Sequence, residues 1–192
     1  MIIWWSGFSI TRFPENSPLA HRVSAILLSL AMLLGFASAA GAHPHIFIDA
    51  KLVVDFDQSG QMVRLGHEWT FDEAFSAWVV QGLDADGDGQ TTSAELQGLA
   101  DENAAGLADF DFYTVAGDAA DPLRFTGAGD QRMTYADGRV TLALSIVPEV
   151  PYPLAGKPLE IGVYDPEYYV AISFGGPDDI SLVGAPAGCD VH

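Results

Sequence analysis

Residues 84 to 95 read DADGDGQTTSAE and carry acidic side chains at the spacing of a calcium-binding loop. Aspartates stand at the first, third and fifth places, a glycine stands at the sixth, and a glutamate stands at the twelfth. Calcium takes roughly six to eight oxygen ligands, and this spacing can supply them from one short wrap of the chain. The expected ligands are Asp84, Asp86, Asp88, Gln90 through its carbonyl, Thr92 and Glu95.

The same stretch also contains a helix-capping signal that needs no metal. Thr92 and Glu95 form the pattern of a capping box, and acidic residues before a helix favour its N-terminus. A cap explains neither the three alternating aspartates nor Gly89. Without a cation the three carboxylates would repel one another. Calcium binding is therefore the preferred interpretation.

The loop stands alone in the chain, which bears on its role. Paired loops of this kind carry Ile, Val or Leu at the eighth place, where this chain has Thr91, and no second loop follows the pattern. A calcium sensor opens a groove through a paired module. We therefore expect a stabilising ion, bound with a dissociation constant on the order of 10⁻⁴ to 10⁻³ M.

Three histidines form a second candidate site, for a transition metal. His43 and His45 flank a proline, and His67 lies on the expected returning strand of the same hairpin. If the hairpin brings them together, three imidazoles would suit Ni²⁺, Co²⁺, Cu²⁺ or Zn²⁺. The alternative is that each is an ordinary surface or hairpin residue.

A copper brace is a further possibility if export processing leaves His43 at the N-terminus. Its amine and ring would then chelate copper, as in a copper carrier or a redox protein. The chain has no G-x-S-x-G, no H-E-x-x-H and no glycine-rich phosphate loop. The leading expectation is therefore a protein that is not an enzyme.

The periodicity of the chain predicts the elements that position these residues. Residues 45–56 and 61–71 alternate apolar and polar side chains, which indicates a hairpin. Helical spacing follows on both sides of the acidic loop, so residues 71–109 are expected to form an EF-hand-like helix-loop-helix. Short β-branched or aromatic runs make up the rest. The expected fold is α+β, a β-rich antiparallel sandwich or meander with this one insertion.

The first 42 residues have the character of an export signal. Residues 23–36 are uncharged and apolar, too short to span a membrane but suited to a signal-peptide core, and small residues follow them. We expect cleavage after Ala40 or Ala42, a periplasmic location, and a single β-rich domain over residues 43–192.

The charge of that domain limits its partners. It holds six basic and 25 acidic residues, a net charge of 6 − 25 = −19. Nucleic acid would be repelled, whereas cations would be attracted. The single cysteine, Cys189, excludes an intramolecular disulfide.

Five stretches in order resemble one bacterial family. They are AHPHIFIDAKL (42–52), WTFDEAFS (69–76), LDADGDGQ (83–90), VYDPEYYVAISF (163–174) and GAPAGC (184–189). The family is that of the domain of unknown function numbered 1007. The resemblance implies an exported protein associated with nickel- or cobalt-type permeases or exporters of the inner membrane. It carries over His43, His45 and the acidic loop, but not His67.

The leading hypothesis is a non-enzymatic periplasmic calcium-binding accessory protein of a metal-ion transport system of the nickel or cobalt type. The first alternative is the copper-brace protein that uses His43. The second is a structural calcium-binding module without a transition-metal role.

Overall fold

The computed structural model describes residues 44–118, 121–154 and 158–192. The chain divides into two units, residues 1–42 and 43–192, and every described residue belongs to the second unit. The expected export signal and His43 lie outside the described residues.

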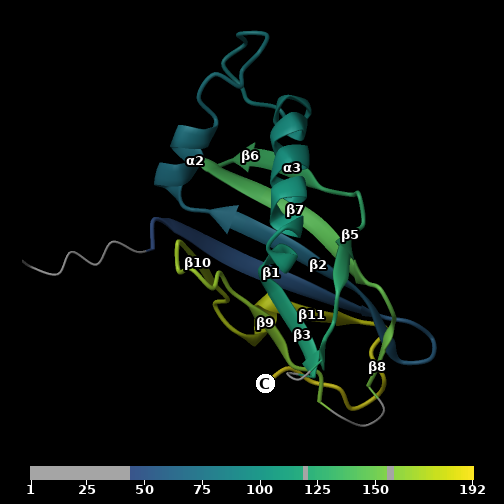
Figure 1. Ribbon diagram of the computed structural model, residues 1–192. Helices are drawn as coiled ribbons and strands as arrows, with labels where there is room; N and C mark the ends of the chain where they lie inside the picture. The colour runs from purple at the N-terminus through teal and green to yellow at the C-terminus, as the bar shows by residue number, and fades with distance from the viewer. Residues whose placement is uncertain (1–43, 119–120, 155–157) are drawn as a thin grey trace, which may run out of the picture. The chain divides into compact units, whose positions relative to one another are not determined.

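The described part of the chain is rich in strands and contains two α-helices (Figure 1). The strands are β1 (Ile46–Phe56), β2 (Gln61–Phe71), β3 (Thr114–Asp118), β4 (Asp121–Pro122), β5 (Phe125–Gly127), β6 (Arg132–Ala136), β7 (Arg139–Pro148), β8 (Tyr152–Pro153), β9 (Ile161–Val163), β10 (Val170–Ser173) and β11 (Ile180–Val183). The helices are α2 (Glu73–Val79) and α3 (Ser93–Ala108), with 3₁₀ turns η1 (Asp111–Tyr113) and η2 (Pro177–Asp179). Among the described helices, none has the length and apolar character needed to cross a membrane.

The main sheet is built around the predicted hairpin. β1 and β2 pair antiparallel, and the strand order is β10-β1-β2-β7-β5, with β11 also on β1, β6 on β7 and β8 on β2. β10 and β11 pair with β1 in the parallel direction, so the expectation of a purely antiparallel sheet is wrong for this edge. A second, three-stranded sheet has the order β4-β3-β9.

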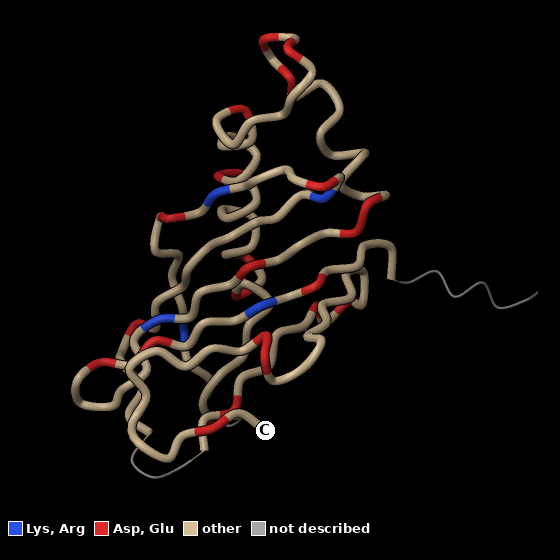
Figure 2. The backbone as a smooth tube through the Cα atoms, turned by 180° about the vertical axis from the view of Figure 1, so that it is seen from behind, with Lys and Arg blue, Asp and Glu red and all other residues tan. Residues whose placement is uncertain are grey.

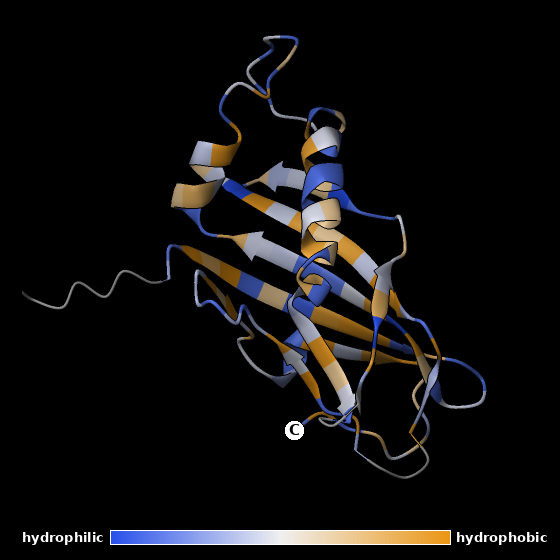
Figure 3. Cartoon of the chain, viewed as in Figure 1, coloured by the Kyte–Doolittle hydropathy of each residue, from blue (hydrophilic) through white to orange (hydrophobic). Residues whose placement is uncertain are grey.

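Alternation along the strands places the core on one face of the main sheet. Ile48, Ala50, Leu52 and Val54 of β1 are buried, while the residues between them point to the other face. α3 lies across the buried face, and β3 continues this second layer (Figures 1 and 3). The buried residues that fill the space are Met62, Leu65, Trp69, Phe71, Leu96, Ala100, Phe112, Ala116, Val140, Leu142, Leu144 and Ile146, among others.

The two helices flank the acidic loop, but the first is shorter than expected. α2 runs from its N-cap Asp72 to Val79, Val80 is its C-cap, and Gly82 two positions later turns the chain with φ +78°. The entering helix therefore stops before the loop. A helix, a connection and a second helix follow one another within residues 71–109, but the EF-hand-like geometry predicted for them is not shown. The connection projects beyond the sheet and carries a group of acidic residues (Figures 1 and 2).

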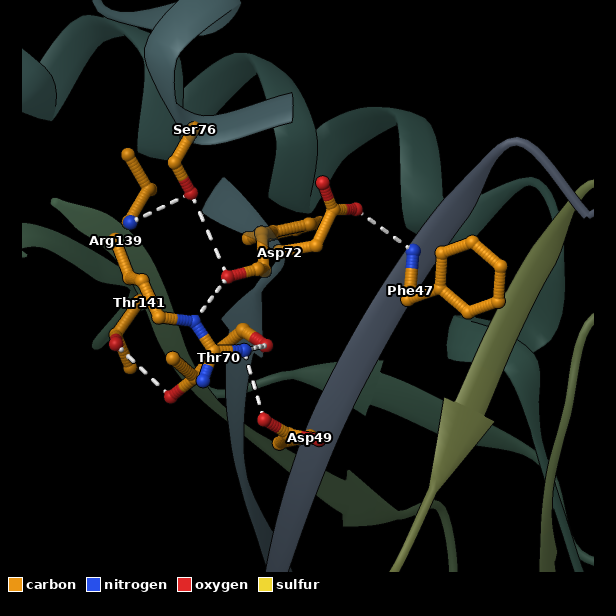
Figure 4. A network of polar contacts seen from close by, with 9 residues as sticks. Phe47, Asp49, Thr70, Asp72, Ser76, Arg139 and Thr141 are labelled. Atoms are coloured by element: carbon orange, nitrogen blue, oxygen red, sulfur yellow. Dashed lines mark hydrogen bonds and ion pairs between the residues drawn. The ribbon is translucent and has the colours of Figure 1, made fainter. Parts of the chain in front are cut away.

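A polar network fixes the start of α2 to three strands of the sheet (Figure 4). Asp72 Oδ2 accepts from the backbone N–H of Phe47 at 2.9 Å. Arg139 donates to the carbonyls of Phe71 and Thr70 at 2.7 and 3.1 Å, and it pairs with Asp49 at 2.7 Å. Because these groups come from β1, β2 and β7, the network sets the position from which the loop projects.

Candidate metal centre

The three aspartates of the loop lie close together. Asp84, Asp86 and Asp88 each offer a carboxylate oxygen, and these oxygens lie within 4.8 Å of one another. Asp84 is half-buried, and the other two are exposed. No other group of three histidine, cysteine or acidic side chains with this proximity occurs among the described residues. The alternating aspartates of the sequence thus bring three carboxylate oxygens close together in the structure.

Backbone hydrogen bonds hold the loop in this shape. Asp84 accepts from the N–H groups of Gly87, Asp88 and Gly89 at 2.8, 3.1 and 2.9 Å. Both glycines have positive φ, +75° and +84°, which lets the chain turn tightly around the Asp84 carboxylate. Asp84 Oδ1 accepts two of these bonds and Oδ2 accepts one, so Oδ2 keeps a lone pair for a cation.

Glu95 connects the two ends of the loop. Its Oε2 accepts from the N–H and the hydroxyl of Thr92, both at 2.8 Å, and its Oε1 accepts from the N–H of Ala85 at 2.8 Å. The Thr92 N–H, the Thr92 hydroxyl and the Ala85 N–H lower the pKa of Glu95. Glu95 therefore stays ionised next to the start of the loop.

The capping box and the loop are both present, so the two interpretations of the sequence do not exclude each other. The Thr92 side chain accepts from the N–H of Glu95 while Glu95 accepts from Thr92, which caps α3. Gln90 lies between these groups and donates its N–H to Asp88 Oδ1 at 2.8 Å. Sequence reasoning missed Ala85, because its contribution is a backbone N–H that any residue except proline would offer.

The structure does not bring the described histidines together. His45 stands seven positions before Leu52, and Leu52 is directly opposite His67 in the β1–β2 ladder. At about 3.4 Å per residue this separates them by roughly 24 Å. The expectation of a three-histidine site fails on this register, because a hairpin aligns only residues that face each other. His43 lies outside the described residues.

The two histidines also have opposite environments. His45 is exposed, its ring lies 5.0 Å from that of Tyr169 between centroids, and its N–H donates to the Tyr169 carbonyl at 2.9 Å. His67 is only 3% exposed and packs in the core beside Trp69. The alternation itself carried this information, because His67 shares its parity with the buried Leu65, Trp69 and Phe71.

Hydrogen bonding fixes the tautomer of His67. The Thr114 hydroxyl donates its one proton to the Phe112 carbonyl at 2.9 Å, so it accepts from His67 Nε2 at 3.2 Å. His67 Nδ1 is therefore unprotonated, and it has no partner, as is also true of Trp69 Nε1. Burial lowers the pKa of His67 from 6.5 to about 4, so the ring is neutral at pH 7.

Comparison with known proteins places the whole described domain in one group. Residues 28–192 match the family model described as "Protein of unknown function (DUF1007)". The chain belongs to this family. An "Uncharacterized protein" of Haemophilus influenzae is 24% identical to the chain over 163 residues, which cover 83% of this chain and 77% of the relative. The DUF1007 match spans both the acidic loop and His45.

Proposed function

We propose that this member of the DUF1007 family is a non-enzymatic calcium-binding accessory protein of the periplasm. The observation that supports the proposal is the convergence of the Asp84, Asp86 and Asp88 oxygens within 4.8 Å on a loop shaped by its own backbone bonds. Calcium would complete its coordination with Gln90, Thr92 and Glu95 and would offset the repulsion among the carboxylates.

The ion would act as a structural clamp. The loop joins α2 to α3, and both helices pack against the main sheet. A cation held between the loop and Glu95 would tie the start of α3 to the segment that leaves α2. A single loop lacks the paired partner through which sensors open a groove.

Calcium is expected to stabilise the domain. For a dissociation constant of 10⁻⁴ to 10⁻³ M, about 10 mM calcium raises the free energy of unfolding by roughly 1.4 to 2.7 kcal/mol. Urea unfolding with and without calcium measures the effect. The Asp86→Asn/Asp88→Asn double variant keeps the side-chain size but loses two charges, so it should lose most of the gain.

Two controls make the calcium test specific. Asp109→Asn removes an exposed acid outside the loop, at the end of α3, and should keep the full calcium effect. Magnesium demands a smaller, octahedral site and should therefore raise the free energy of unfolding less than calcium does. Equal stabilisation of the double variant and the Asp109→Asn variant by calcium would rule out the loop as the binding site.

We further propose that the protein serves a metal-ion transport system of the nickel or cobalt type, with an inner-membrane permease or exporter as its partner. The exposed position of His45 at the start of β1 supports this, because a transferable metal needs an accessible ligand. The copper-brace alternative uses the same end of the chain. N-terminal sequencing of the exported protein separates them, since a start at Gly41 rules out a brace built on His43.

Binding of Ni²⁺ or Co²⁺ is expected to depend on His45 and not on His67. Removing a ligand in His45→Ala should weaken binding by about tenfold or more, as measured by isothermal titration. The buried His67→Leu change is the matched control and should leave binding unchanged. If Ni²⁺, Co²⁺, Cu²⁺ and Zn²⁺ all fail to bind the unchanged protein, the transport proposal loses its support from the residues.

A further inference from the structure

The face of the main sheet opposite α3 contains a hollow with a floor of small residues. Gly66 of β2 lies opposite Val53 of β1 on one side and opposite Ser145 of β7 on the other. Ala143 lies two positions before Ser145 on β7, and alternate residues of a strand share a face. Ala143 and Ser145 are only 9% and 5% exposed although they point away from the core. Longer side chains therefore wall them in, and the hollow has a volume of ≈ 220 Å³.

The packing does not require a glycine at position 66. A Cβ there would lie 3.6 Å from the Val53 Cβ and 3.8 Å from the Ser145 Oγ, which are ordinary contacts, and its φ is not positive. A glycine inside a strand weakens it and often marks a place where a ligand or another backbone approaches closely. The sequence thus keeps open a space that a side chain could fill.

The hollow is lined by charged residues of both signs, three basic (Lys51, Arg64 and Arg132) and four acidic (Glu68, Asp130, Asp178 and Asp179). Figure 2 shows how few basic residues the domain has among its acidic ones. Lys51 pairs with Glu68 at 3.2 Å, and Arg64 pairs with Asp55 at 2.8 Å. Asp130 accepts from the Ser145 N–H at 2.8 Å. Arg64 also lies 3.9 Å from Asp130, so each of these charged side chains has an ion-pair partner.

Two charged side chains at opposite ends of the hollow have no such partner. Within the described residues, the side chains of Arg132 and Asp178 have neither an ion-pair nor a hydrogen-bond partner, and both line the hollow. Arg132 is on β6, beyond β7, and Asp178 is in η2, which leads into β11 beyond β1. The hollow therefore offers a cation at one end and an anion at the other.

We propose that the hollow binds a short extended peptide as a zwitterion. Its carboxylate would lie at Arg132, its ammonium group at Asp178, and its backbone over Gly66. The strands β11 and β6 are separated by four interstrand spacings of about 4.8 Å each. The side chains of Arg132 and Asp178 cover part of this distance. A tripeptide spans roughly 10 Å. The volume is below the roughly 300–1,000 Å³ of sites for larger ligands, which favours so small an occupant.

This site is independent of the calcium loop, because no residue from 84–95 lines it. The probe is triglycine, which has both charges and no side chains to add other contacts. NMR amide shifts of the purified protein, titrated to about 10 mM triglycine, should change at Gly66, Ala143 and Ser145. The same peptide with its ends acetylated and amidated should cause no such change, since it has lost both charges.

Variants of the two end groups test the orientation. Arg132→Gln and Asp178→Asn should each weaken triglycine binding about fivefold. Arg124 lies outside the hollow, where it pairs with Asp111, so Arg124→Gln is the matched control and should bind as the unchanged protein does. Amide shifts that are absent, that lie elsewhere, or that are equal for the capped peptide would overturn the proposal.

Filling the floor separates binding from folding. Gly66→Val places a strand-favouring side chain in the hollow, and its Cβ meets only ordinary van der Waals contacts, so the melting temperature should stay or rise while triglycine binding is lost. Gly66→Ala is the smaller companion change and should weaken binding in part. Unchanged binding in the Gly66→Val variant would show that the peptide does not lie over Gly66.

Discussion

Lowering the pH from 7 to 4 is expected to remove about 3 kcal/mol of folding stability through His67 alone. The pKa of His67 is 6.5 in the unfolded chain and about 4 in the folded domain, because burial disfavours the charged ring. The unfolded state therefore binds more protons in this window. The contribution is complete above pH 6.5 and is lost as the pH falls toward 4, at about 1.4 kcal/mol per pKa unit.

The His67→Leu variant isolates this effect from the acidic residues that also titrate. Leucine cannot be protonated, and it removes the unpartnered Nδ1 from the core. Urea unfolding at pH 7 and pH 4 should show the unchanged protein losing about 3 kcal/mol more than this variant. His45→Gln, which changes an exposed ring, should behave as the unchanged protein. An equal loss in all three proteins would mean that His67 is protonated in the folded state.

Asp165→Ala is expected to destabilise the domain by about 3 kcal/mol. Asp165 is 5% exposed, and its carboxylate accepts from the N–H groups of Glu167, Tyr169 and Val170, each at 2.9 Å. Hydrogen bonds to a charged acceptor each contribute roughly 1.5 to 3 kcal/mol, and water replaces some of them at this turn. Because Val170 begins β10, losing the carboxylate also loosens the parallel pairing of β10 with β1.

Two comparisons show whether the carboxylate acts as an acceptor. Asp165→Asn keeps one acceptor oxygen and should lose about half as much stability, measured by urea unfolding. Asp57 makes similar bonds to Ser59 and Gln61, but in a partly exposed turn, so Asp57→Ala should cost less than about 1 kcal/mol. Faster amide exchange in β10 should accompany the loss in Asp165→Ala. Equal effects at both positions would contradict the argument from burial.

Local patterns predicted the elements that depend on local physics. The alternation of residues 45–56 and 61–71 places the hairpin within one residue of β1 and β2. The Thr92–Glu95 signal predicted the start of α3, and the capping box is formed there. The loop spacing predicted three oxygens close together, because alternate positions in a tight wrap of chain point inward. Each of these outcomes is decided by residues at most 23 positions apart, the separation of the paired Ile48 and Phe71 at the open end of the hairpin.

The parallel pairing of β10 and β11 and the grouping of the histidines were mispredicted because both depend on contacts between separate segments. Nothing local in β10 or β11 indicates that they pair in parallel with β1, since the ladder depends on the path of the chain after Tyr164. The helix before the loop is shorter than its apolar periodicity predicts, because it ends at Val79 with Val80 as its C-cap, and this periodicity does not report where a backbone leaves the helix. The prediction of a three-histidine site assumed that histidines of one hairpin lie close together. The register of the two strands decides instead which residues face each other.

The sequence by itself determined the hairpin, the capped helix α3 and the acidic loop, because strand alternation, capping and loop wrapping are satisfied by residues close together in the chain. Strand alternation placed His67 on the core side, and only the tertiary structure decided its hydrogen bonding there and the hollow over Gly66. His67 became a neutral core residue because α3 and β3 cover that face of the sheet. The hollow exists because β1, β2 and β7 align Gly66 with Ser145 between walls that come from β6 and η2. Burial and charge pairing at these places arise from segments that meet only when the sheet has formed.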